Sequence, residues 1–126
     1  MITAVRREKL VAEITAGTHK LLADVPVSLG GTGLGPGPHE IFEASLAACT
    51  IITLQMYADR HQWNLTSADV KVTIEKEGAE SHLRREITLK GDLTGEQKTR
   101  LLEIAEKCPI HKLMTSHITI STVHGS

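Results

Sequence analysis

The stretch EIFEASLAACTIITLQMYADR, residues 40–60, decides the fold of this chain. Its apolar side chains cover more than one face of a helix, and a proline stands just before it, suited to a first helical position. We therefore predict a helix from about Pro38 to Gln62. A helix that is apolar over most of its circumference is buried in a core or an interface. In so small a chain, we expect this helix to lie between a sheet and a second subunit.

The residues before this helix read as extended chain followed by a loop. Residues 2–28 are rich in aliphatic side chains, and Gly17-Thr18 is a plausible hairpin turn between the stretches 10–17 and 19–27. Residues 30–38, GGTGLGPGP, contain five glycines and two prolines. We interpret them as a loop that leads into the helix.

The residues after the helix predict two half-buried antiparallel strands. The sequences ADVKVTIEKEG (68–78) and HLRREITLKG (82–91) alternate apolar and polar side chains, which is typical of strands with one solvated face. The inward-facing residues are Val70, Val72 and Ile74 in the first strand, and Leu83, Ile87 and Leu89 in the second.

The C-terminal third predicts a second helix and a last strand. In residues 93–107, Thr94 and Gln97 form a capping box, and the apolar stripe comprises Leu101, Leu102, Ile104 and Ala105. Pro109 stops this helix, and SHITISTV (116–123) alternates as a strand does. The order of elements predicts an α+β fold with an antiparallel sheet, in one domain over residues 1–126.

Composition excludes several function classes. The 126 residues include 14 basic and 15 acidic side chains, well mixed, and only one Trp, one Tyr and one Phe. Neither the charge nor the aromatic content favours nucleic acid or an anionic membrane surface as a partner. We expect no membrane-spanning stretch and no signal peptide, and hence a cytoplasmic protein in which the two cysteines do not form a permanent disulfide.

The two cysteines each allow a structural and a chemical interpretation. Cys108 precedes Pro109, which suits the start of a short helix, so unpaired backbone N–H groups would stabilise its thiolate. Alternatively, it fills a gap at a helix end. Cys49 alone is typical of an inert core cysteine, but the glycine-rich loop before its helix could let a ligand approach. Glu40 lies about two and a half turns from Cys49 and could reach it only through a third group.

A metal site is a weaker alternative. Cys108 and His111 form one close-spaced C-x2-H pair, whereas a closed zinc site usually has two such pairs. We therefore expect neither a metal nor a cofactor.

Two segments together resemble the OsmC/Ohr family of thiol peroxidases, and most closely its OsmC-like branch. The first is GGTGLGPGPHEIFEASLAACTIITLQMYADRHQW (30–63) and the second is LKGDLTGEQKTRLLEIAEKCPIHKLMTSHITI (89–120). The resemblance implies an intertwined homodimer with about six antiparallel strands in each subunit and long helices packed centrally. It implies that Cys49 attacks an organic hydroperoxide, that Cys108 resolves the sulfenate as an intrachain disulfide, and that an external dithiol, of lipoyl type in some members, reduces the pair.

The resemblance also implies a glutamate and an arginine that activate the attacking thiol. Glu40 stands one position later than the family's glutamate, and the arginine would come from the N-terminal strands, where Arg7 is our candidate beside Arg6. Arg60, Arg84 and Arg85 could substitute for it. The alternative function is a dimeric redox-sensing or ligand-binding protein that keeps the cysteine pair but turns over little.

Overall fold

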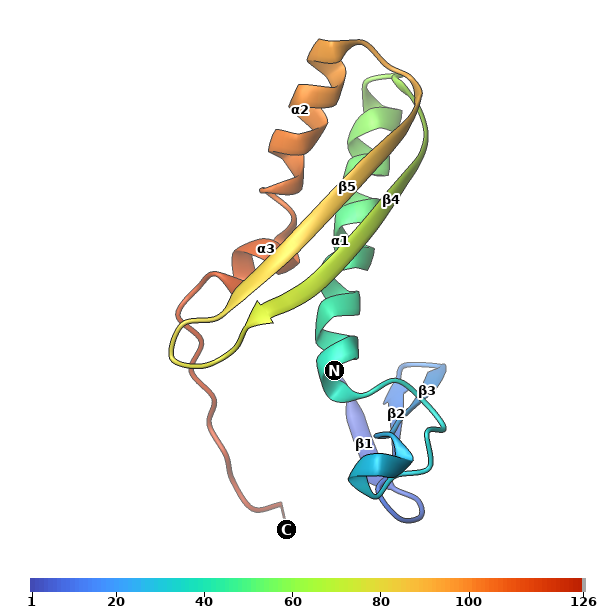
Figure 1. The fold of residues 1–126 in the computed structure, drawn as a ribbon, viewed down its shortest axis with the longest axis vertical. Coiled ribbons are helices and arrows are strands. Elements are labelled where there is room, and N and C mark those ends of the chain that lie inside the picture. The colour runs from blue at the N-terminus through green and yellow to red at the C-terminus, as the bar shows by residue number, and fades with distance from the viewer. Residues whose placement is uncertain (126) are drawn as a thin grey trace. The chain divides into compact units, whose positions relative to one another are not determined.

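The computed structural model describes residues 1–125 and is an α+β fold with antiparallel sheets (Figure 1). The chain divides into two compact units, residues 1–44 and residues 45 onward. The elements in chain order are β1 (Thr3–Arg6), β2 (Ala12–Ala16), β3 (His19–Ala23), the short 3-10 helix η1 (Val27–Leu29), α1 (Pro38–Arg60), β4 (Asn64–Lys76), β5 (His82–Asp92), α2 (Gly95–Ala105) and α3 (Pro109–Met114).

The first unit is built on a three-stranded antiparallel sheet in the order β1-β2-β3. Ala16 pairs with His19, so the predicted two-residue turn at Gly17-Thr18 is confirmed. Gly17 has a φ of 61°, a left-handed conformation that glycine adopts without the steric cost a side chain adds. The predicted strand over 19–27 is shorter than expected, because β3 ends at Ala23 and η1 follows.

A buried carboxylate holds the glycine- and proline-rich loop. Asp24 is 2% exposed and accepts hydrogen bonds from the backbone N–H groups of Val25, Thr32 and Leu34 and from the Thr32 hydroxyl. A Cβ at Gly31 would collide with the backbone carbonyl of Val25, so only glycine permits this close approach. The loop before α1 is therefore ordered by one side chain.

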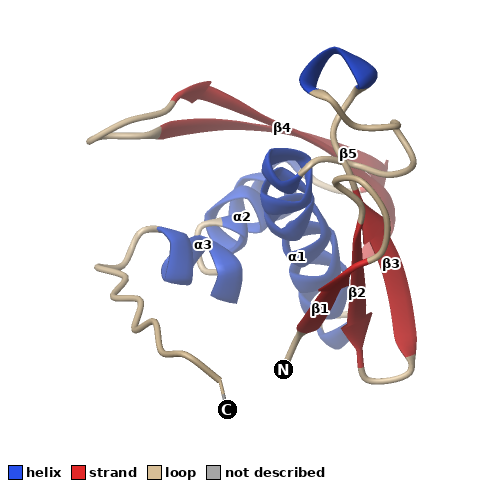
Figure 2. Cartoon of the chain, turned by 90° about the horizontal axis from the view of Figure 1, so that it is seen from below, coloured by secondary structure: helices blue, strands red, loops and turns tan. Residues whose placement is uncertain are grey.

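The second unit packs α1 and α2 against the long β4–β5 hairpin. Figure 2 shows the helices on one side of this hairpin. The core cluster takes residues from α1, β4 and α2 in turn: Leu54, Ala58, Leu65, Ala68, Leu101, Ile104 and Ala105. Both predicted strands and their alternation are confirmed, and so are the helix that begins at Pro38 and the capping box of Thr94 and Gln97.

Two expectations, one about a strand and one about burial, were wrong for the single chain. Residues 116–123 form no strand. The described strands make a three-stranded and a two-stranded sheet, so the expected sheet of about six strands is not confirmed. A strand needs the backbone of a neighbouring strand to complete its hydrogen bonds. The alternating pattern of one segment does not show whether such a neighbour is available. Leu102, predicted in the apolar stripe of α2, is 47% exposed.

The long helix α1 is also only partly covered within this chain. Its buried residues are Leu46, Thr50, Leu54 and Ala58, which repeat every fourth position along one face. Among the apolar residues on its other faces, Ile52 is 58% and Met56 is 48% exposed. By length and composition α1 could cross a membrane, contrary to the expectation that no stretch would qualify. That criterion is also met by core helices of soluble proteins, so it argues only weakly for a membrane.

Candidate active site

Cys49 lies midway along α1 with its side chain partly exposed. Its Sγ is 3.8 Å from the hydroxyl of Thr53, one helical turn further on. The hydroxyl of Thr50, the next residue, donates to the carbonyl of Leu46 at 2.6 Å and is fully buried. The helix therefore places a reachable sulfur beside a hydroxyl that can donate to it.

Cys108 occupies the N-cap of α3, as the sequence predicted from the following proline. Its side chain is fully buried, and its Sγ accepts a hydrogen bond from the backbone N–H of His111 at 3.3 Å. Pro109 at the start of the helix has no N–H to satisfy, so the first available donors are those of Ile110 and His111. The end of this short helix thus presents N–H groups to sulfur.

The structure brings the two cysteines together as free thiols. Burial alone would raise the pKa of Cys49. The backbone N–H of Ile110, the Cys108 thiol, the Thr53 hydroxyl and the charge of Arg85 outweigh it, so this pKa lies below its usual value.

Cys108 shows the opposite direction. Burial raises the pKa of the Cys108 thiol, and the adjacent Cys49 sulfur raises it further, which outweighs the hydrogen bond from the N–H of His111. Of the two thiols, Cys49 therefore ionises first, while Cys108 keeps its proton to higher pH and can donate a hydrogen bond to the Cys49 sulfur. The arrangement favours one nucleophilic thiolate with a protonated thiol beside it.

Arg85 connects the helix of Cys49 with the turn of Cys108. It lies on the inner face of β5 with only 11% of its side chain exposed. Its guanidinium donates to the Thr50 hydroxyl at 3.2 Å, to a Glu106 carboxylate oxygen at 3.0 Å and to Nδ1 of His111 at 3.0 Å. These contacts satisfy a cation that would otherwise be costly to bury.

A cavity of about 240 Å³ lies beside residues that neighbour the two cysteines, although neither cysteine lines it. Two of its lining residues flank the site, because Thr53 contacts the Cys49 sulfur and Pro109 follows Cys108. The complete lining is Thr53, Met56, Tyr57, Arg60, Ile104 and Pro109. Apart from the Arg60 guanidinium and two hydroxyl groups, these side chains offer apolar surface.

The comparison with protein families decides the family. The family described as OsmC-like protein matches residues 31–123, which include both cysteines. The chain belongs to the OsmC-like family. A search of curated proteins found no significant match.

Solved structures with the OsmC-like fold cover nearly all of this chain. A putative osmotic stress induced and detoxification response protein from Psychrobacter arcticus 273-4 is 18% identical, with a TM-score of 0.77 over 89% of this chain and 85% of the other. An OsmC-like protein from Mycoplasma pneumoniae is 20% identical, with a TM-score of 0.77 and coverages of 90% and 85%. The organic hydroperoxide resistance protein OhrB of Bacillus subtilis is 25% identical, with a TM-score of 0.58 and coverages of 91% and 89%.

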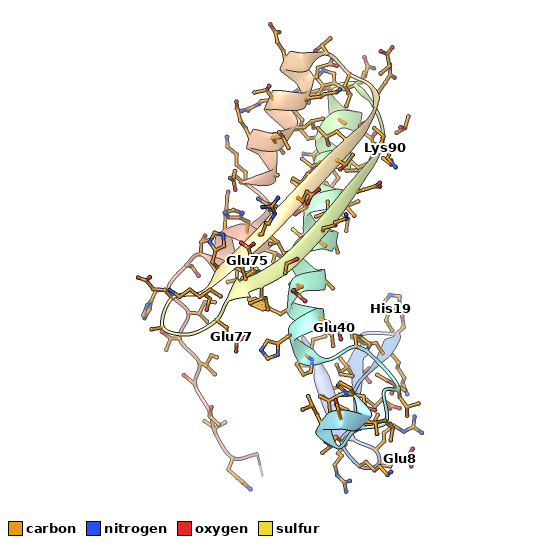
Figure 3. The ribbon with its side chains drawn as sticks, in the orientation of Figure 1. Glu8, His19, Glu40, Glu75, Glu77 and Lys90 are labelled. Atoms are coloured by element: carbon orange, nitrogen blue, oxygen red, sulfur yellow. The ribbon has the colours of Figure 1, made fainter. Side chains whose placement is uncertain are left out.

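Glu40 and Arg7, the other two predicted site residues of this OsmC-like chain, make local contacts. Glu40 lies in the first turn of α1 (Figure 3), where its carboxylate accepts a hydrogen bond from the Gly37 N–H at 2.9 Å. The Arg7 guanidinium is 3.0 Å from the Glu13 carboxylate, and 59% of the Arg7 side chain is exposed. Their activation of Cys49 stays a prediction.

Sequence reasoning missed Thr53 and Ile110 and left Arg85 as one of several substitutes. Arg85 had a signal in the sequence, because it occupies an inward position of the alternating strand between Leu83 and Ile87. Ile110 acts through its backbone N–H, which no side-chain motif reveals. Over the described part of the chain, no three His, Cys, Asp or Glu side chains gather as metal ligands.

Proposed function

We propose that this OsmC-like chain is a thiol peroxidase that reduces organic hydroperoxides through Cys49 and Cys108. The observation that carries the proposal is the pairing of a partly exposed thiol of lowered pKa with a buried thiol of raised pKa. The first suits a nucleophile and the second suits a proton-bearing resolving group. The apolar lining of the nearby cavity suits an organic peroxide.

The reaction proceeds in three balanced steps. The Cys49 thiolate attacks the terminal oxygen of the hydroperoxide, the O–O bond breaks, and the leaving alkoxide takes up a proton to become an alcohol. The resulting Cys49 sulfenic acid condenses with the Cys108 thiol, which forms the S–S bond and releases water. An external dithiol, for which a lipoyl-type compound is our candidate, then reduces the disulfide by thiol exchange and is itself oxidised.

The proposal includes a cytoplasmic homodimer. The exposed apolar residues Ile52 and Met56 of α1 support a second copy as the covering surface. The resemblance to the OsmC/Ohr family implies the same homodimer. The proposal retains Glu40 and Arg7 as candidate activators of Cys49.

One observation favours the slower alternative, a redox-sensing or ligand-binding protein with little turnover. The Arg85 guanidinium that favours the Cys49 thiolate is also ion-paired with the Glu106 carboxylate at 3.0 Å. An acidic partner reduces the field that a cation exerts on a nearby thiol. Steady-state turnover separates the two functions.

The test is consumption of cumene hydroperoxide by the full chain with dihydrolipoamide as reductant. We expect multiple turnovers for the wild type, none for Cys49→Ser, and a single slow turnover for Cys108→Ser that ends in over-oxidised Cys49. Hydrogen peroxide should react more slowly than the organic peroxide. Equal multi-turnover activity in both variants would refute the assignment, and one stoichiometric oxidation without turnover would favour the sensing alternative.

A further inference from the structure

The position of Arg85 in β5 is set by the alternation of the strand. Leu83, Arg85 and Ile87 share the inner face, so the guanidinium enters the packed side of the hairpin where an aliphatic residue would be expected. A buried arginine requires partners, because an unpaired charge in the interior is strongly unfavourable. What this guanidinium contacts therefore indicates why it is there.

Its partners come from three different elements. Thr50 belongs to α1 and directly follows Cys49, Glu106 is the C-cap of α2, and His111 belongs to α3. The Thr50 hydroxyl donates its hydrogen bond to the Leu46 carbonyl, so its oxygen is available to accept one from Arg85. One guanidinium thus links α1 to both sides of the turn that carries Cys108.

The guanidinium also contacts the side chain of His111. It lies 3.0 Å from Nδ1 of that imidazole, and the same Nδ1 is 3.3 Å from the Glu106 carboxylate. The backbone N–H of His111 donates to Cys108 Sγ. By contacting the His111 side chain, the Arg85 guanidinium therefore helps to hold the backbone N–H that binds the resolving sulfur.

The charges around Cys49 give Arg85 a second effect. The ionisable groups of the described residues that act on this site are Cys108 at the α3 N-cap, Arg85 on β5, His111 on α3 and Glu106 at the end of α2. Of these, Arg85 contributes the positive charge that favours a Cys49 thiolate. Glu106, 65% exposed, is ion-paired with Arg85 at 3.0 Å, and a carboxylate so placed is expected to offset part of that charge. Removing the Arg85 charge should therefore raise the Cys49 pKa, and removing the Glu106 charge should lower it.

Given the proposed function, we infer that Arg85 is a positioning residue that serves both cysteines at once. Its guanidinium places positive charge beside Cys49. Through its contacts with Glu106 and His111, it also holds the turn that carries the resolving residue Cys108. A β5 residue thus supplies positive charge at Cys49, whereas the family resemblance implies a cation from the N-terminal strands.

The test is the pH dependence of Cys49 alkylation by iodoacetamide, read by peptide mass spectrometry without peroxide. Arg85→Met should raise the apparent pKa of Cys49 and slow alkylation at pH 7 about tenfold. The rate at high pH should be unchanged, because the Cys49 thiol is ionised there in every variant. Arg85→Lys should recover part of the loss. Glu106→Gln should lower the apparent pKa, and the exposed neighbour Arg84→Met should match the wild type.

The outcomes separate a structural role from the inferred one. If Arg85→Met lowers the high-pH rate but leaves the apparent pKa unchanged, Arg85 only supports the fold and the inference is wrong. If Arg85→Met does not fold, Arg85→Lys and Glu106→Gln decide, and a Glu106→Gln profile identical to wild type overturns the inference. Peroxide consumption, measured separately, tests the proposed function. If the protein consumes no peroxide but its Cys49 pKa still depends on Arg85, the peroxidase function is refuted and the inference about Arg85 stands.

Discussion

The backbone N–H of His111 donates a hydrogen bond to Sγ of Cys108 at 3.3 Å, while the N–H of the preceding residue acts on the sulfur of Cys49. The first turn of one six-residue helix, α3, therefore serves both sulfurs. Because these N–H groups have no partner within the helix, they are free to stabilise negative charge at either sulfur during the reaction.

The hydroxyl of Thr53 should contribute to the reactivity of Cys49. Thr53→Val keeps the shape of the side chain and removes the group 3.8 Å from Sγ that helps to lower the Cys49 pKa. The pKa should rise, so alkylation at pH 7 should slow about threefold, as expected for one modest hydrogen bond. The control is Thr73→Val on the exposed face of β4. Equal rates for both variants and the wild type would show that the Thr53 hydroxyl has no such effect.

Asp24 should make stability depend on pH in the acid range. Hydrogen bonds from the Thr32 hydroxyl and three backbone N–H groups outweigh burial and lower its pKa to about 2. A carboxylate with a lowered folded-state pKa stabilises the protein above its ordinary value of 3.8, and this contribution is lost as the pH falls toward 2.

Asp24→Asn should therefore lower the thermal midpoint of unfolding at pH 7. The midpoint of the variant should also fall less between pH 4 and pH 2 than that of the wild type. Thermal unfolding monitored by circular dichroism at several pH values measures both effects. Asp92→Asn, at an exposed position at the end of β5, is the control and should behave as the wild type does. A variant whose acid sensitivity equals that of the wild type would contradict the role assigned to the Asp24 carboxylate.

Adjacent leucines in α2 offer a matched test of the core. Leu101 is fully buried, whereas Leu102 is 47% exposed. Leu101→Ala should lower the free energy of unfolding by about 2–5 kcal/mol because it opens a cavity. Leu102→Ala should change it by less than about 0.5 kcal/mol. Urea denaturation at fixed protein concentration gives both values, and a larger loss for Leu102→Ala would contradict the packing of α2.

Local patterns predicted most elements, but not the contacts that assemble the site. Pro109 was enough to predict Cys108 at a helix N-cap. The alternation of β5 also implies an inward position for Arg85, although the prediction named only Leu83, Ile87 and Leu89 on that face. The meeting of Cys49 and Cys108 depends on the β4–β5 hairpin and α2 returning the chain to α1. Spacing along the sequence does not encode that return. Residues 116–123 alternate as a strand does, yet pattern alone provides no neighbouring backbone to pair with.

The most direct test of the central claim is the intact mass of the reduced protein after a small excess of an organic hydroperoxide, with peroxide loss followed in parallel. The account predicts a rapid loss of two hydrogens per chain, matched by one peroxide consumed and reversed by a dithiol. Peptide mapping should locate the new bond between Cys49 and Cys108. No mass change, or only slow addition of oxygen to methionines, would contradict it.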